Sequence, residues 1–301
     1  MPNFLSSTQI NEIISSLPLA DDKTQANAAA RQAQLTKPMG SLGRLEGVAI
    51  WMAGWQRRER PSIDHGQCIV FAGNHGVVKQ GISPFPAEVT AQMVANFKAG
   101  GAAINQLCEL ADLKLDVIPL DLEHPTNDLS LGPAMTEDEV IVAMNIGADA
   151  LDAECDYLIV GEMGIGNTTS AAALCLGRFG ADAADWAGPG TGLDDKGVKR
   201  KADVIKAALA KQAPIDRNPV ALLAAVGGRE LAAIAGAVLA ARVRSIPVML
   251  DGYTSTAAAS ALTANGQLAA LDHTMISHMS AEPGHRQLAI ALDKQPLVDL
   301  Q

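Results

Sequence analysis

VGEMGIGNTTS, residues 160–170, follows the apolar run 157–160 and leads into an Ala-rich segment, 168–179. A short apolar run of this kind is typical of a strand that is covered on both faces. The three glycines in the stretch allow a tight turn into a helix. A strand joined to a helix in this way is the repeating unit of α/β proteins with a parallel sheet.

Four further apolar runs continue the pattern, at 67–72, 114–119, 246–250 and 274–277. Segments of helical composition alternate with the runs, at 88–98, 137–154, 168–179, 199–211, 230–244 and 254–262. Thr136 and Glu139 have the spacing of a capping box, which predicts a helix start directly after Thr136. We therefore expect an α/β fold, a three-layer Rossmann-like parallel sheet with helices on both faces.

The first 60 residues contain no strand pattern. Two helical patterns, 21–35 and 44–58, are separated by the Pro- and Gly-containing stretch 37–43. We expect an N-terminal helical segment at 1–60, forming a small helical subdomain together with the C-terminal segment. The α/β domain is expected at 61–301.

The composition excludes several classes of protein. With 48% hydrophobic and 19% charged residues, the chain has enough apolar material for a core, which excludes wholesale disorder. Its 23 Lys and Arg against 33 Asp and Glu give a net charge of −10, so nucleic acids and anionic membranes are not expected partners. Aromatic residues make up only 3%, too few for base-stacking platforms.

The four cysteines, Cys68, Cys108, Cys155 and Cys175, lie in apolar surroundings and none has a C-x-x-C spacing. We interpret them as buried thiols in a reducing compartment rather than as disulfides or zinc ligands. The N-terminus has no secretory pattern, and the longest uncharged stretch, 252–271, is too polar for a membrane span. The expected location is cytoplasmic.

Two glycine-rich loops predict a phosphate site, because glycines let backbone N–H groups and a helix N-terminus approach an anion. In the first loop, Asn167 stands where a P-loop has lysine, and Thr169 where a dinucleotide fingerprint has its third glycine. A monophosphate is therefore favoured over a triphosphate or a dinucleotide. The second loop, 188–195, precedes a helix that carries Lys201, which could reach the same phosphate. The alternatives are a tight turn with capping threonines and a solvated basic helix face.

Other polar clusters follow the remaining strand patterns, and parallel strands present such residues at one edge of the sheet. His75 follows the first strand, although a lone histidine is more often structural than catalytic. Asp251 follows the fourth, and Glu282 follows the fifth between two histidines whose spacing is not a metal-ligand pattern. Convergence of these strand ends predicts an enzyme that acts on a small phosphorylated molecule, with no metal site.

Several segments together resemble one family, the nicotinate-nucleotide–dimethylbenzimidazole phosphoribosyltransferases of cobalamin biosynthesis. They cover nearly the whole chain in family order: KPMGSLGRLE (37–46), FAGNHGV (71–77), ISPFPAEVTAQMV (82–94), GEMGIGNTTSAAAL (161–174), GPGTGLDD (188–195), GGRELAAIAGA (227–237), MLDGYTSTAAA (249–259) and HMSAEPGHR (278–286).

The resemblance implies a reaction. A phosphoribosyl group moves from nicotinate mononucleotide to a nitrogen of 5,6-dimethylbenzimidazole, giving α-ribazole 5′-phosphate and nicotinate. The pyridinium is already a good leaving group, so no cofactor or metal is expected. A carboxylate general base and a site for the 5′-phosphate are needed. The resemblance also implies a homodimer.

Residue roles follow from the same resemblance. Glu162 is the expected catalytic carboxylate. The expected phosphate and nucleotide ligands are Gly164, Gly166, Asn167, Thr168, Thr169, Gly190, Gly192 and Lys201. Ser83, Gln92 and Met163 are expected to line the benzimidazole pocket, with Gln92 in a stretch one residue longer than the family form.

The family's principal general base is a Glu in an R-L-G-E-G-[ST]-G-A-like motif, which would follow 296–300, and the sequence ends at Gln301. Glu162, and less favourably Glu282, are the substitutes within this sequence. The main alternative to an active enzyme is a non-catalytic or truncated relative that binds nucleotides or bases. A Rossmann-type dehydrogenase is the least favoured interpretation.

Overall fold

Over residues 3–214, 216 and 218–299, without the side chains of 264 and 265, the computed structural model contains one parallel sheet of five strands in the order β2-β1-β3-β4-β5. The strands are β1 (Gly66–Ala72), β2 (Lys114–Pro119), β3 (Tyr157–Met163), β4 (Val248–Leu250) and β5 (Thr274–Ile276). Each strand overlaps the apolar run that predicts it, although β3 ends later and β4 begins later than its run, and the expected α/β architecture is confirmed.

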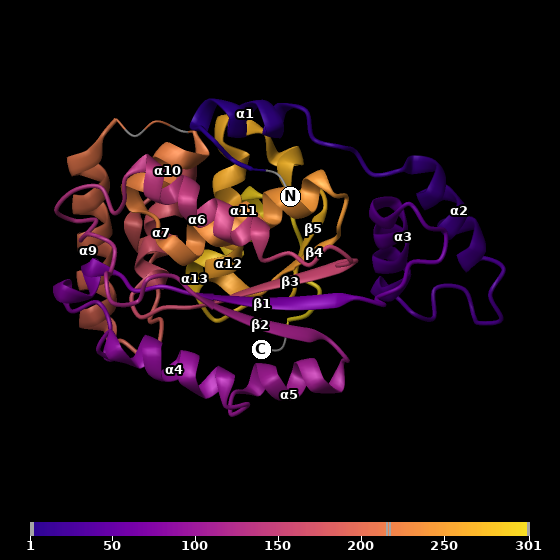
Figure 1. The fold of residues 1–301 in the computed structure, drawn as a ribbon, viewed down its shortest axis with the longest axis horizontal. Helices are drawn as coiled ribbons and strands as arrows, with labels where there is room; N and C mark the ends of the chain where they lie inside the picture. Colours follow the sequence, from indigo (N-terminus) through magenta and orange to yellow (C-terminus); the bar gives the residue numbers. More distant parts are fainter. Residues whose placement is uncertain (1–2, 215, 217, 300–301) are drawn as a thin grey trace.

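Pairing partners in the sheet point to the same side, which divides its residues between two faces. Ile69 pairs with Val160, and both lie in the main hydrophobic core. That face is covered directly by α11 (Arg229–Val243) and α12 (Gly252–Ser260). α6 (Glu137–Asp149) packs on α11, and α10 (Pro219–Val226) packs on α6, in the same helical layer (Figure 1). Their high Ala content lets these helices pack closely over the strands.

Cys68 pairs with Ile159 on the opposite face of the sheet. There α4 (Glu88–Lys98) and α5 (Ala103–Leu110) cover β2 and its neighbours (Figure 1). α3 (Arg44–Gln56) packs on the same face through Met52, which contacts Tyr157 and Met249. Helices therefore lie on both faces, as the three-layer prediction requires.

The N-terminal helices occupy two places. α1 (Ser7–Ser15) contributes Ile10 and Ile14 to the main core. α2 (Asp22–Gln32) packs on α3 to one side of the sheet (Figure 1). Arg44, at the start of α3, donates to the carbonyl of Leu297 at 2.7 Å, which joins this helical part to the C-terminal segment.

The remaining elements connect these layers. They are η1 (Gly76–Gln80), α7 (Asn167–Phe179), α8 (Ala183–Trp186), α9 (Asp195–Gln212), η2 (Ala261–Gly266), η3 (Leu268–Leu271) and α13 (Pro283–Ala291). The capping box predicted at the start of α6 is present. Glu139 N donates to Thr136 Oγ1 at 3.2 Å, and Thr136 N donates to Glu139 Oε2 at 2.8 Å.

Two glycines allow α6 and α11 to cross in close contact. A Cβ added at Gly147 would lie 1.8 Å from the carbonyl oxygen of Ala233, and one added at Gly236 would lie 2.0 Å from that of Met144. Both contacts are with backbone, which cannot rotate away. We expect Gly236→Ala to lower the free energy of unfolding by about 1–3 kcal/mol through overpacking, measured by urea denaturation.

Gly47→Ala is the matched control for that variant, because Gly47 also lies in a helix and its Cβ would meet nothing within 4 Å. It should raise the free energy of unfolding by about 0.5–1 kcal/mol. Equal effects of the two substitutions would contradict the close crossing.

Candidate active site

The carboxyl ends of the neighbouring strands β1 and β3 lie side by side at the C-terminal end of the parallel sheet. From β1 the chain passes to β2 on one side, and it returns to place β3 on the other. Such a reversal of strand order opens a crevice where ligands bind in open α/β sheets. The site is therefore expected where Gly73 follows β1 and Gly164 follows β3.

β3 extends three residues further than its apolar run predicts. Glu162 pairs with Phe71, Met163 pairs with Ala72, and Gly73 N donates to the carbonyl of Met163 at 3.0 Å. The prediction that the strand ends at residue 160 was wrong, because pairing with β1 keeps the backbone extended through Gly161. Glu162 thus projects from a strand held on one side by β1.

The Glu162 carboxylate is half-buried and accepts a hydrogen bond from the side-chain amide of Asn167. Burial, followed by the negative charge of Glu230, raises its pKa to about 7, and Asp251 adds to this effect. The Asn167 amide opposes the shift. A carboxylate with a pKa near neutrality is suited to accept a proton from a substrate.

The turn after Glu162 is fixed from two sides. Asn167 N donates to the carbonyl of Gly164 at 3.2 Å, and Ile165 N donates to Thr90 Oγ1 of α4 at 3.1 Å. Gly166, at φ +93°, precedes the first residue of α7 in a left-handed conformation that glycine adopts without strain.

A buried ammonium lies beyond this turn. Lys201 Nζ donates to Thr168 Oγ1 at 2.7 Å and to the carbonyl of Gly188 at 3.0 Å. A Cβ at Gly190 would lie 3.2 Å from Thr168 Oγ1 and 3.4 Å from Lys201 Nζ. The structure thus brings together Thr168, Gly190 and Lys201. Burial lowers the pKa of Lys201 to about 8. A bound anion would raise this pKa again, because a nearby negative charge favours the charged ammonium.

The second glycine loop is also bound to Glu282. Gly190 N donates to Glu282 Oε1 at 2.7 Å, and a Cβ at Gly188 would lie 2.1 Å from Glu282 Oε2. Gly190 and Gly192 have φ of +55° and +117°, so the loop depends on glycine at both places. Glu282 thus holds this loop through Oε1, while its Oε2 is buried with no hydrogen-bond partner among the described residues.

The other predicted ligands, Thr169, Ser83 and Gln92, lie on α7, in the loop before α4 and on α4 respectively. Thr169 is fully buried, and its hydroxyl has no partner among the described residues. Ser83 Oγ accepts from Phe85 N at 3.1 Å in the loop before α4, while Gln92 is exposed on α4. The contacts recorded for the described residues do not link Gln92 to Glu162.

Glu230 is the residue that the sequence reasoning missed. It is fully buried in the first turn of α11, and its Oε1 lies 2.5 Å from His75 Nε2. A signal was present, because GGRE (227–230) places Glu230 directly before the apolar stretch 231–241 in the first turn of a helix.

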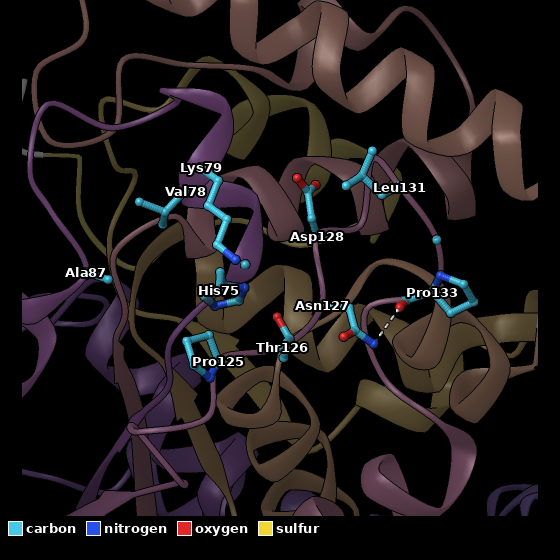
Figure 2. Close-up of a pocket in the computed structure, with 12 residues that line it drawn as sticks. His75, Val78, Lys79, Ala87, Pro125, Thr126, Asn127, Asp128, Leu131 and Pro133 are labelled. Carbon is cyan, nitrogen blue, oxygen red and sulfur yellow. Dashed lines mark hydrogen bonds between the residues drawn. The ribbon is translucent and has the colours of Figure 1, made fainter.

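A cavity of about 620 Å³ lies beside His75, between η1 and the loop 125–133. Figure 2 shows His75 and Lys79 on one side of it, with Asn127, Leu131 and Pro133 on the other. It adjoins the loop that follows β1, and its lining residues do not include Glu162, Thr168 or Lys201.

Within the described part of the chain, the helices are all too short or too polar to span a bilayer.

Known proteins match this chain over nearly its full length. The family model described as "Phosphoribosyltransferase" (DBI_PRT) matches residues 17–301. A protein of Mesorhizobium japonicum named nicotinate-nucleotide–dimethylbenzimidazole phosphoribosyltransferase is 52% identical over 297 residues, covering 99% of this chain and 88% of the relative. A Ruegeria protein of the same name is 50% identical over 300 residues, covering 100% and 88%.

Solved structures agree with these matches. Crystal structures from Thermus thermophilus, one described as CobT and one as the same phosphoribosyltransferase, are 38% identical to this chain. They superpose with TM-scores of 0.84 and 0.85, covering 92% and 93% of this chain and 89% and 88% of theirs.

Proposed function

Because this chain belongs to the nicotinate-nucleotide–dimethylbenzimidazole phosphoribosyltransferase family, we propose that it transfers phosphoribosyl from nicotinate mononucleotide to 5,6-dimethylbenzimidazole. The products are α-ribazole 5′-phosphate and nicotinate. The alternative of a non-catalytic relative is not favoured by relatives of this name at about 50% identity.

One observation carries the residue assignment. Asn167 and Thr168 are consecutive at the start of α7, and their side chains bind Glu162 and Lys201 respectively. A single helical turn thus connects a carboxylate suited to accept a proton with an ammonium suited to bind an anion.

The chemistry follows from this arrangement. The 5′-phosphate binds between Lys201, Thr168 and the glycine loop with Gly190 and Gly192, with Gly164, Gly166, Asn167 and Thr169 forming the adjoining turn. Held in this way, the ribose C1′ faces the acceptor, and positioning supplies much of the rate.

A benzimidazole nitrogen forms the new bond to C1′ as the bond from C1′ to the nicotinate nitrogen breaks. The electron pair of that bond returns to the pyridine ring. Glu162 accepts the proton that leaves the other benzimidazole nitrogen. Ser83, Met163 and Gln92 contact the benzimidazole ring.

The proposal is tested by incubating the purified chain with nicotinate mononucleotide and 5,6-dimethylbenzimidazole, without added metal. We expect α-ribazole 5′-phosphate and nicotinate in equal amounts, quantified by chromatography with mass detection. Binding of both substrates by calorimetry with no product would support the non-catalytic relative instead.

Two finer assignments belong to the same proposal. The family resemblance supports a homodimer, which light scattering would detect as about twice the 31.3 kDa chain mass. Four cysteines that are free and buried support a cytoplasmic location.

A further inference from the structure

A buried polar network lies beneath the turn that follows Glu162. The imidazole of His75 contacts Glu230 Oε1 through Nε2 at 2.5 Å and Ser170 Oγ through Nδ1 at 3.0 Å. It therefore joins three elements, the loop after β1, the first turn of α7 and the first turn of α11. All three side chains are at most 2% exposed, so none can touch a substrate in the crevice.

Glycines enclose this network on the side of the site. A Cβ at Gly73 would lie 2.1 Å from Glu230 Oε2, and one at Gly228 would lie 2.3 Å from His75 Cε1. A Cβ at Gly164 would lie 3.3 Å from Glu230 Oε1 and 2.6 Å from the carbonyl oxygen of Gly73. Side chains at these positions would displace the pair, so the backbone around the crevice is shaped to hold it.

The backbone at Gly164 connects this network to the Glu162 carboxylate. Gly164 is two residues after Glu162, and its carbonyl binds the N–H of Asn167, whose amide holds the Glu162 carboxylate. Glu230 Oε2 is buried and has no hydrogen-bond partner among the described residues. His75 engages Oε1, and Oε2 faces the backbone of Gly73, where an added Cβ would lie 2.1 Å away.

We propose that the His75–Glu230 pair, anchored by Ser170, is a positioning element for Glu162, which fixes the turn 162–167 and places a second carboxylate beneath it. This inference rests on the proposed function of Glu162 as proton acceptor. It assigns to GGRE and to His75 a role that the reaction scheme does not otherwise use.

The charged groups that face Glu162, directly or through a neighbouring side chain, come from four parts of the fold. Glu230 acts from α11 and Asp251 from the end of β4, and both raise the pKa of Glu162. His75 contacts Glu230 from the loop after β1, and His278 lies 3.4 Å from Asp251 after β5. Removing the charge of Glu230 alone therefore lowers the pKa of Glu162 below about 7.

The test is Glu230→Gln, which preserves the shape and a hydrogen-bond acceptor for His75. We expect kcat to fall by roughly 10- to 100-fold, because a small displacement of a catalytic group has effects of this size. KM for nicotinate mononucleotide should be unchanged. The acid limb of the kcat/KM profile should move to lower pH than in the parent, which a merely loosened fold would not produce.

Ser170→Ala is the second variant, and it also serves if Glu230→Gln does not fold. It removes one hydrogen bond and retains the Glu230 carboxylate, so kcat should fall by roughly 2- to 10-fold. The acid limb of the kcat/KM profile should stay at the pH found for the parent. Glu139→Gln is the matched control, because Glu139 is a half-exposed carboxylate paired with Arg229 beside Glu230. It should match the parent in kcat and pH profile.

The outcomes separate the inference from the proposed function. Folded Glu230→Gln with the kcat and acid limb of the parent overturns the inference, provided that Glu162→Gln is impaired. Ser170→Ala with the parent kcat overturns it where Glu230→Gln does not fold. Parental turnover in Glu162→Gln instead overturns the assignment of Glu162 itself.

Discussion

Lys201→Met raises KM for nicotinate mononucleotide by roughly 10- to 150-fold, the expected loss of a charged hydrogen bond of about 1.5–3 kcal/mol. Met preserves the stem that fills the buried channel and removes only the ammonium. The affected contacts are those to Thr168 Oγ1 and the Gly188 carbonyl, where the anion would bind. Steady-state kinetics with varied nucleotide at saturating acceptor measures the effect.

Lys199→Met on the same helix is the control, because Lys199 is exposed. It should leave KM unchanged. A KM for Lys201→Met equal to that of the parent would remove Lys201 from the phosphate site.

The buried ammonium of Lys201 that helps to bind an anion also lowers the stability of the folded chain. The pKa of Lys201 is lowered to about 8 from 10.5, so between these pH values the unfolded chain binds more protons than the folded one. The free energy of unfolding of the parent therefore rises as pH rises from about 8 to 10.5. Below pH 8, the buried ammonium of Lys201 lowers that free energy. Lys201→Met should accordingly fold with a Tm at least as high as that of the parent at pH 7.

Glu162→Gln is expected to lower kcat by about 10²- to 10⁴-fold, the usual contribution of a general base. KM for nicotinate mononucleotide should change little, because the amide can still bind Asn167 and the phosphate contacts lie on other residues. Single-turnover product formation at saturating substrates measures the loss.

The pH profile provides an independent check on Glu162. Its pKa is raised to about 7, so the carboxyl becomes protonated and unable to accept a proton as pH falls through 7. kcat/KM of the parent should decline there, and this limb should be absent in the variant. Glu154→Gln, an exposed residue before the amino end of the same strand, should behave as the parent. Unchanged turnover in Glu162→Gln would exclude Glu162 as the base.

The sequence predicts the strands and most helices because their signals are local. Apolar runs are short where both faces of a strand are covered, and the capping box of Thr136 and Glu139 places the start of α6. Glycines in two separate loops, with Lys201 on the helix after the second loop, suffice to predict one shared anion site. The structure brings Thr168, Gly190 and Lys201 together. The segment after 299 and the family motif expected beyond Gln301 lie outside the described residues.

Tertiary packing decides which of several similar side chains faces the crevice. Thr168, Thr169 and Ser170 are consecutive hydroxyl residues, and each is rotated by about 100° from the last in a helix. Thr168 binds Lys201, whereas Thr169 is buried and Ser170 binds His75, so three neighbouring hydroxyls have three different surroundings.

Composition and motif spacing by themselves determine an acidic α/β protein with glycine-rich strand ends, and they predict a phosphate site, because these features depend on residue type and local order. The pairing of His75 with Glu230, 155 positions apart, and the capture of Glu282 by Gly190 arise only when distant segments pack. Burial then sets the proton affinity of Glu162 and Lys201, since desolvation depends on every element that surrounds a group.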